Sequence, residues 1–184
     1  MKVLVACEYS GRVRDAFLAR GHDAISCDLL DTDAPGPHYK GDVFDIIKDG
    51  WDIIIMHPPC TALAVSGNRW YGRGMPKNKE RSEAIEWTLR LWRTALQFSK
   101  RVAMENPVGV LPMPATQYIQ PWQFGHGETK KTGLWLHNLK PLFPTNVVDG
   151  REQRIHKMPP SPERWKKRSE TYHGIANAMA DQWG

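Results

Sequence analysis

The sequence contains no long apolar run, since none approaches the roughly 20 consecutive residues that span a bilayer. The apolar stretch near the N-terminus is about six residues long and then turns polar, so it is too short for a signal peptide. Cysteine is scarce, because Cys7, Cys27 and Cys60 are widely spaced and form no Cys-x-x-Cys pair. We therefore expect no membrane segment, no disulfide framework, no zinc site, and a reducing compartment.

Internal repeats and low-complexity tracts are also absent. The 184 residues suit one domain with a sizeable core, and 41% of them are hydrophobic, so we expect a packed globule. The net charge of +5 and the isoelectric point near 9.2 permit a nucleic-acid partner. They do not require one, because many ordinary proteins are mildly basic.

Short apolar segments rich in β-branched residues alternate with helical patterns. The expected strands are residues 2–7, 23–28, 51–56, 101–105 and 133–138. The expected helices are residues 12–20, 80–100 and 175–183, and the spacing of Ile85, Leu89, Trp92 and Leu96 predicts the buried face of the second. This alternation predicts an α/β fold with a mostly parallel sheet and helices on both faces.

Proline and glycine indicate where the chain is irregular. Residues 31–39 are expected to form a loop, and residues 41–48 a short strand end followed by a helical turn. Prolines break the chain often after Pro107, and residues 151–168 are basic and proline-rich, so we expect the latter to be extended and exposed.

Three of the expected strands end on a polar or reactive residue: Asp28, Cys60 and Glu105. Ligands of open α/β sheets bind at the carboxyl ends of the strands. The regularity therefore predicts a site at that edge, although a lone cysteine such as Cys60 is by itself more often a buried structural residue.

A cysteine and a carboxyl group at one sheet edge suit covalent chemistry on a cytosine ring. Carbon 5 of cytosine is a poor nucleophile, but a thiolate that adds to carbon 6 turns the ring into an enamine, which attacks an electrophilic methyl group. A carboxyl group near ring nitrogen 3 lowers the barrier by general-acid or electrostatic assistance.

The motifs around these residues resemble those of the DNA cytosine-5 methyltransferases. Pro58-Pro59-Cys60 with Ser66-Gly67 is similar to the family's catalytic motif, with Thr61 in place of glutamine. Glu105-Asn106 is similar to its Glu-Asn-Val motif, with Pro107 in place of valine. The resemblance implies a Rossmann-like methyltransferase fold abridged after the fifth strand, S-adenosylmethionine as methyl donor, Cys60 as nucleophile with Pro59 fixing the turn, and assistance by Glu105.

The resemblance also implies a donor site. Residues 7–11 stand at the family's first motif, although only Gly11 matches its glycines well, and residues 174–179 resemble its last motif. Asp28 resembles the residue that holds the ribose, and Asp42 the one that bonds the adenine amino group. A plain strand–helix turn, capping aspartates and an ordinary closing helix are the alternatives. The implied donor contacts are Glu8, Tyr9, Ser10, Gly11, Asp28, Leu29, Asp42, Val43, Pro58 and Asn177.

The second half of the chain departs most from the family. Lys131 stands where the family has the first arginine of Gln-x-Arg-x-Arg, and a large target-recognition domain is missing or reduced to residues 138–168. Trp165, Trp122 or His126 are candidates for stacking on an extruded base. A solvated basic connection is the alternative for this segment. The expected nucleic-acid contacts are Ser66, Arg69, Arg151, Arg154, Lys157, Lys166, Lys167 and Arg168.

We therefore expect a single domain over residues 1–184, with a donor-binding and catalytic core (1–110), a basic proline-rich segment facing the substrate (111–170) and a closing helix (171–184). The resemblance, which is to compact phage-type enzymes, implies double-stranded DNA as partner, no metal, and a bacterial or phage-infected cytoplasm. The same chemistry on a cytosine nucleotide, single-stranded DNA or RNA, and a degenerate fold that only binds nucleic acid, remain alternatives. An amino-methyltransferase is disfavoured because His57 and Cys60 occupy the positions that its motif needs.

Overall fold

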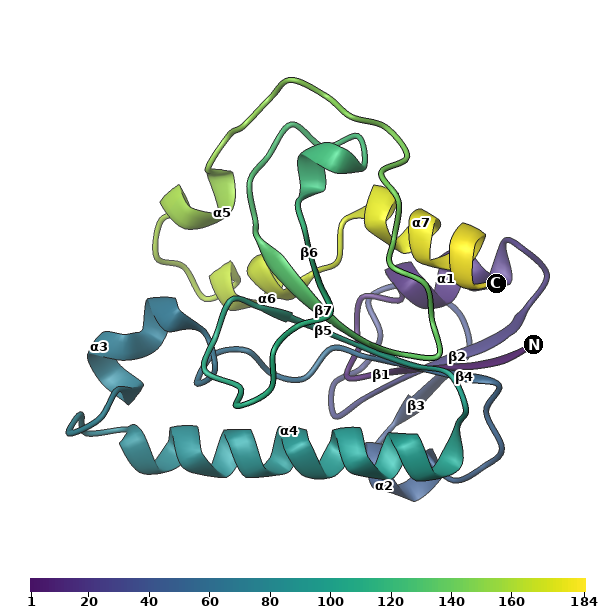
Figure 1. The fold of residues 1–184 in the computed structure, drawn as a ribbon, viewed down its shortest axis with the longest axis horizontal. Coiled ribbons are helices and arrows are strands. Elements are labelled where there is room, and N and C mark those ends of the chain that lie inside the picture. Colours follow the sequence, from purple (N-terminus) through teal and green to yellow (C-terminus); the bar gives the residue numbers. More distant parts are fainter.

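The computed structural model describes residues 1–184, and a seven-stranded mixed sheet lies at its centre, in the order β3-β2-β1-β4-β5-β7-β6 (Figure 1). Strand β7 is antiparallel to both of its neighbours, whereas the other neighbouring pairs are parallel. The strands are β1 (Lys2–Ala6), β2 (Asp23–Asp28), β3 (His38–Lys40), β4 (Ile53–Met56), β5 (Val102–Pro107), β6 (Gln117–Ile119) and β7 (Thr132–His137).

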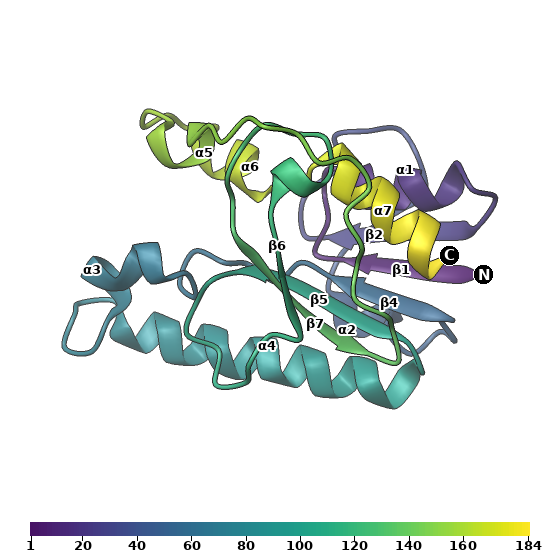
Figure 2. The same ribbon diagram turned by 45° about the horizontal axis from the view of Figure 1, so that its top comes forward.

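Helices cover both faces of this sheet (Figures 1 and 2). Helices α1 (Arg12–Leu18) and α7 (His173–Trp183) pack together on one face, and α2 (Val43–Ile46) and α4 (Asn78–Phe98) lie on the other. None of the helices combines the length and the apolar character that a membrane span requires. The remaining helical segments are η1 (Val65–Gly67), α3 (Asn68–Tyr71), η2 (Pro121–Gln123), α5 (Arg154–Lys157) and α6 (Arg164–Ser169).

The side chains of the central strands alternate between the two helical layers, as the twofold period of a strand requires. Val3, Val5, Ile53 and Ile55 belong to the core that includes α1 and α7. The residues between them, Leu4, Ala6, Ile54 and Met56, belong to the core on the α2 and α4 side. All of these positions are fully buried, which explains why β1 and β4 are continuous apolar runs in the sequence.

The structure confirms the α/β class and the mostly parallel sheet, and the arrangement is compatible with a Rossmann-like fold. Each of the five expected strands and three expected helices is present, with bounds within two residues of those expected. Two elements differ from the expectation. Tyr39 belongs to β3, which pairs with β2, and not to the preceding loop. Strand β6, which the sequence did not predict, pairs with β7 at the sheet edge.

Residues 151–168 were expected to be extended and exposed, and this prediction is wrong for part of the segment. They include α5 and nearly all of α6, and Ile155 on α5 is buried in the core. The carbonyl oxygen of Lys166 on α6 accepts a hydrogen bond from Tyr9 at 2.6 Å. Tertiary contacts of this kind stabilise short helices that local sequence alone does not favour.

The buried face of α4 also differs from the expected one. Thr88, Leu91 and Ala95 are the buried positions in the centre of this helix, whereas Leu89 and Leu96, two of the expected residues, are only half-buried. The expected residues therefore lie beside the row of α4 residues that is buried against the sheet. The expected face was chosen for its large apolar residues, whereas the buried positions include the small residues Thr88 and Ala95.

This difference can be tested by truncating one leucine from each line. We expect Leu91→Ala to reduce the free energy of unfolding by about 3 kcal/mol, because it leaves a cavity in a closed core. Leu89→Ala is expected to cost less than about half as much, since its side chain already contacts water. Urea denaturation of both variants measures the difference, and equal losses would contradict the assignment.

Candidate active site

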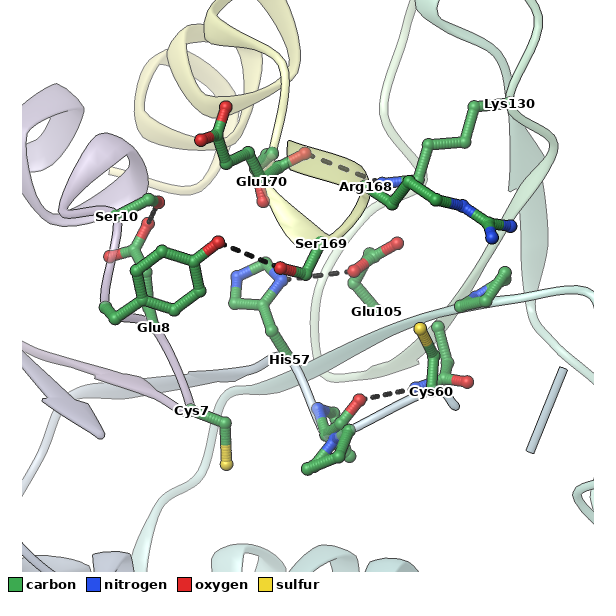
Figure 3. A pocket seen from close by; sticks show the side chains of 16 residues that line it. Cys7, Glu8, Ser10, His57, Cys60, Glu105, Lys130, Arg168, Ser169 and Glu170 are labelled. Atoms are coloured by element: carbon green, nitrogen blue, oxygen red, sulfur yellow. Dashed lines mark hydrogen bonds and ion pairs between the residues drawn. The ribbon is translucent and has the colours of Figure 1, made fainter. Parts of the chain in front are cut away.

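A small cavity lies at the carboxyl ends of β1, β4 and β5 (Figure 3). The chain order reverses between β1 and β4, and ligands of open α/β sheets bind in the crevice at such a reversal. Five segments far apart in the sequence meet there, since Lys130 is separate from residues 105–107. They supply Cys7, Glu8, Tyr9 and Ser10; His57, Pro58, Pro59 and Cys60; Glu105, Asn106, Pro107 and Lys130; and Arg168, Ser169, Glu170 and Thr171.

Strand register brings His57 and Glu105 side by side. Met56 pairs with Met104 in the parallel β4–β5 ladder, so the next residue of each strand lies level with the other. Nδ1 of His57 and Oε2 of Glu105 are 3.2 Å apart, and the side chains are 7% and 13% exposed. The pair is therefore nearly sequestered from water.

The Glu105 carboxyl group is ionised at neutral pH. Burial raises its pKa, but the hydrogen bond from His57 and the positive charge of Lys130 outweigh that effect, and the net pKa lies below its usual value. The Cys60 thiol behaves differently. Burial raises the pKa of Cys60, and the nearby Glu105 charge adds to the rise, while Lys130 and Arg168 act in the opposite direction.

Cys60 is held in place by contacts on both sides of its turn. Nδ2 of Asn106 donates to the carbonyl oxygen of Pro58 at 2.8 Å, which ties the Pro-Pro turn to β5. After the turn, the amides of Leu63 and Ala64 donate to the carbonyl oxygen of Cys60. The buried Arg81 of α4 then holds the loop that leads to α3, because its Nε donates to the carbonyl oxygen of Ala62 at 2.7 Å.

The turn between β1 and α1 is stabilised by the side chain of Glu8, which belongs to the turn itself. The buried carboxylate of Glu8 accepts hydrogen bonds from the amides of Val13 at 2.7 Å and Arg14 at 3.2 Å, so it caps the start of α1. Burial raises the pKa of Glu8. Gly11 has a φ of 72°, and a Cβ there would lie 2.3 Å from the guanidinium group of Arg14, so only glycine fits.

Four of the expected donor contacts lie along the same sheet edge but outside the cavity. Asp28 ends β2 and accepts a hydrogen bond from the amide of Leu30 at 3.0 Å, and burial raises its pKa. Asp42 caps α2 by accepting from the amide of Phe44 at 2.9 Å. Leu29 is 73% exposed, and Val43 is buried in the core. The capping role that the sequence left open for Asp42 is present, and the second carboxylate oxygen stays available.

A segment formed by residues 164–171, which we call the strap, closes the cavity. Tyr9 donates to the carbonyl oxygen of Lys166, and Nζ of Lys166 is 2.5 Å from Oδ1 of Asp33. On the other side, Arg12 binds the carboxylate of Glu170 at 2.5 Å and the carbonyl oxygen of Thr171 at 2.9 Å. The cavity beneath the strap measures about 70 Å³, whereas drug-sized ligands occupy roughly 300 Å³ or more. The cavity in this structure is therefore too small to hold a whole nucleoside.

Three further residues of the expected catalytic and donor sites do not line the cavity: Gly11, Lys131 and Asn177. Lys131 is exposed and lies over the ring of Tyr118 at 4.6 Å, while its neighbour Lys130 lines the cavity. Asn177 is exposed on α7 and lies 3.4 Å from Arg20, near the C-terminal end of α1. The cavity lies at the opposite, N-terminal end of α1, so the structure does not bring Asn177 to it.

The expected nucleic-acid contacts surround the cavity on two sides. Ser66 and Arg69 are exposed on η1 and α3, where Arg69 lies 5.2 Å from the ring of the exposed Trp70. The strap and α5 stand on the other side of the same edge (Figures 1 and 2). From the strap, Arg168 lines the cavity itself.

A second, open hollow of about 410 Å³ lies between α5 and α6. Arg154, Lys157 and Lys167 line it, so it is strongly basic. Arg154 is paired with Glu128 at 2.8 Å. Lys157 and Lys167 are therefore the lysines of the hollow whose charges have no paired carboxylate. Arg151 lies outside this hollow, 3.9 Å from the ring of Trp122.

The sequence did not single out several residues that line the cavity: His57 as a partner of Glu105, Lys130, and Ser169, Glu170 and Thr171 of the strap. For His57 a signal existed, because it follows Met56 directly and continues the alternation that places Ile55 on the α1 face. No comparable pattern indicated Lys130 or the strap. No cluster of three or more His, Cys, Asp or Glu side chains is arranged to hold a metal ion.

Comparison of the chain with protein-family models and with curated proteins finds no match.

The cavity position of Lys130 can be tested through the reactivity of Cys60. Removing the Lys130 charge should raise the pKa of Cys60 further, so that less thiolate exists at a given pH. We expect Lys130→Gln to slow alkylation of Cys60 by iodoacetamide at pH 8 by about threefold, and Lys131→Gln to leave it unchanged. Peptide mass spectrometry follows Cys60 separately from Cys7 and Cys27. If only Lys131→Gln slowed the reaction, Lys131 and not Lys130 would be the lysine close to Cys60.

Proposed function

We propose that this protein is a methyltransferase with a Rossmann-like fold, which transfers a methyl group from S-adenosylmethionine to carbon 5 of cytosine in DNA. The observation that supports this most is the meeting of Cys60 and Glu105 in one cavity, beside the turn that follows β1. Sequence motifs suggested each residue separately. Their strand ends were expected to meet at one sheet edge, and the two residues, which come from the ends of β4 and β5, line the same cavity.

The residues of the cavity can perform the steps that this reaction needs. The Cys60 thiolate attacks carbon 6, and the S–C bond forms as ring nitrogen 3 takes up a proton from solvent. Because Glu105 is ionised, it assists by stabilising that proton electrostatically. S-adenosylmethionine supplies the electrophilic methyl group to carbon 5. Solvent then takes the proton from carbon 5, the S–C bond breaks, and nitrogen 3 returns its proton to solvent, which regenerates the Cys60 thiolate.

The donor side of the site suits a nucleoside with an amino-acid group. Asp28 and Asp42 each keep a carboxylate oxygen available at the sheet edge, where a ribose and an adenine amino group find hydrogen-bond acceptors. Next to them the cavity offers polar groups from the β1–α1 turn and the strap.

A second candidate is the same chemistry on a cytosine nucleotide. The observation that favours it is the pair of positive side chains, Lys130 and Arg168, inside the cavity with Cys60, since they suit a phosphate group. Methyl transfer to duplex DNA, single-stranded DNA and deoxycytidine monophosphate distinguishes the two. A catalytically degenerate binding protein is the third candidate, and a calorimetric titration that shows no S-adenosylmethionine binding at millimolar concentration would favour it.

The covalent mechanism predicts a trapped complex. With S-adenosylmethionine and DNA containing 5-fluorocytosine, the protein should form an adduct that survives denaturation, because fluorine replaces the carbon 5 proton and cannot be removed by a base. Cys60→Ala should form none, and Glu105→Gln should slow methylation of ordinary DNA about 100-fold or more. Denaturing electrophoresis and nucleoside mass spectrometry measure these outcomes. Full activity of Cys60→Ser would rule the mechanism out.

The basic hollow between α5 and α6 predicts salt-dependent binding of DNA. The double variant Lys157→Ala/Lys167→Ala should lower the slope of log affinity against log salt concentration by about 2, because each phosphate contact contributes about 0.9. Lys2→Ala/Lys48→Ala, at the opposite edge of the sheet, serves as the matched control. Fluorescence anisotropy at several salt concentrations measures both, and equal slopes would exclude the hollow from the interface.

A further inference from the structure

His57 stands between two halves of the cavity and has one ring nitrogen unused. Its Nδ1 is bound to Glu105, whereas its Nε2 is buried and has no hydrogen-bond partner in the protein. A buried polar atom without a partner costs about 1–3 kcal/mol, so such an atom usually has a use. The side chain is 93% buried, since 7% of it is exposed, and it lines the cavity.

The state of the two nitrogens follows from the neighbouring carboxylate. Glu105 is ionised and can only accept, so Nδ1 of His57 carries the hydrogen of this contact. In the neutral imidazole, Nε2 is then the acceptor. It therefore suits an N–H donor of a ligand.

The unused nitrogen faces the Glu8 side of the cavity. In Figure 3, Glu8 and Ser10 lie on one side of His57, and Cys60 and Arg168 lie on the other, while Nζ of Lys130 is 3.5 Å from the carbonyl oxygen of Glu170. The nitrogen without a dashed line points toward the first group. The carboxylate of Glu8 on that side already accepts from the amides of Val13 and Arg14, so Nε2 of His57 is the acceptor there that has no partner.

The amides at the start of α1 are already used. Glu8 accepts from Val13 and Arg14, so these amides do not receive a carboxylate of a ligand. The amino-acid part of a methyl donor therefore needs other partners in this protein.

We propose that Nε2 of His57 accepts a hydrogen bond from the α-ammonium group of S-adenosylmethionine, while its Nδ1–H holds Glu105 in position. This inference rests on the proposed function and deepens it. His57 is thus a donor-binding residue and a positioning residue for Glu105, and it links the two ends of the cavity.

Substitution of His57 by asparagine or by glutamine should remove one of its two contacts at a time, either the one from Nε2 or the one from Nδ1. In His57→Asn the amide lies near the position of Nδ1 and keeps a donor for Glu105, but nothing replaces Nε2. In His57→Gln the amide reaches the position of Nε2, and the contact with Glu105 is lost. His137→Gln, an exposed histidine at the end of β7, is the matched control.

Calorimetry should show a Kd for S-adenosylmethionine about tenfold higher in His57→Asn than in the wild type, as a hydrogen bond to a charged group requires. His57→Gln should bind the donor more tightly than His57→Asn but have the lower kcat. Methylthioadenosine, which has no ammonium group, should bind to the wild type and His57→Asn equally.

The outcomes separate the two proposals. If the wild type fails to bind S-adenosylmethionine, the proposed function fails and the inference fails with it. If the wild type binds the donor and His57→Asn binds it equally well, only the inference is overturned. An equal loss for methylthioadenosine in a variant with an unchanged melting temperature also overturns it, because the ammonium group would then not be the partner.

Discussion

The site depends on the parallel register of β1, β4 and β5. Ala6 pairs with Met56, and Met56 pairs with Met104, so the next residues, His57 after β4 and Glu105 within β5, lie at one level beside the end of β1. Neighbouring strands lie about 4.8 Å apart, which brings side chains on the same face within hydrogen-bond reach. A slip of one residue would send one member of the His57–Glu105 pair to the α4 face. The buried apolar residues before them prevent such a slip.

The turn after β1 shows a second constraint, which is the placement of buried charge. Arg14 is fully buried, and its guanidinium group donates to Ser26, Thr32 and the carbonyl oxygen of Ala34. It thereby anchors the loop between β2 and β3, which follows Asp28. Glu8 closes the start of α1 on the other side of the turn. A turn that lacks most of the expected glycines is thus held by two buried ionisable side chains.

The sequence predicted the central strands from their continuous apolar runs, and the three longest helices from their helical spacing of apolar residues, although this spacing indicated the wrong buried face of α4. It also predicted Cys60 and Glu105 at one edge, since strand ends in a parallel sheet meet there. It did not distinguish Lys130 from Lys131, because the chain between β5 and β7 follows no regular period. The strap could not be predicted either, since Tyr9 and Asp33 hold it from more than 130 residues away.

The strap contains both residues that were expected to contact phosphate groups and residues that line the cavity. Its residues Lys166 and Arg168 were expected to meet phosphate groups, while Ser169 and Glu170 line the cavity. Lys166 is paired with Asp33, so an anion that binds Lys166 competes with that contact. The cavity beneath this segment measures about 70 Å³. An anion bound at Lys166 would therefore act on the same segment that supplies Ser169 and Glu170 to the cavity wall.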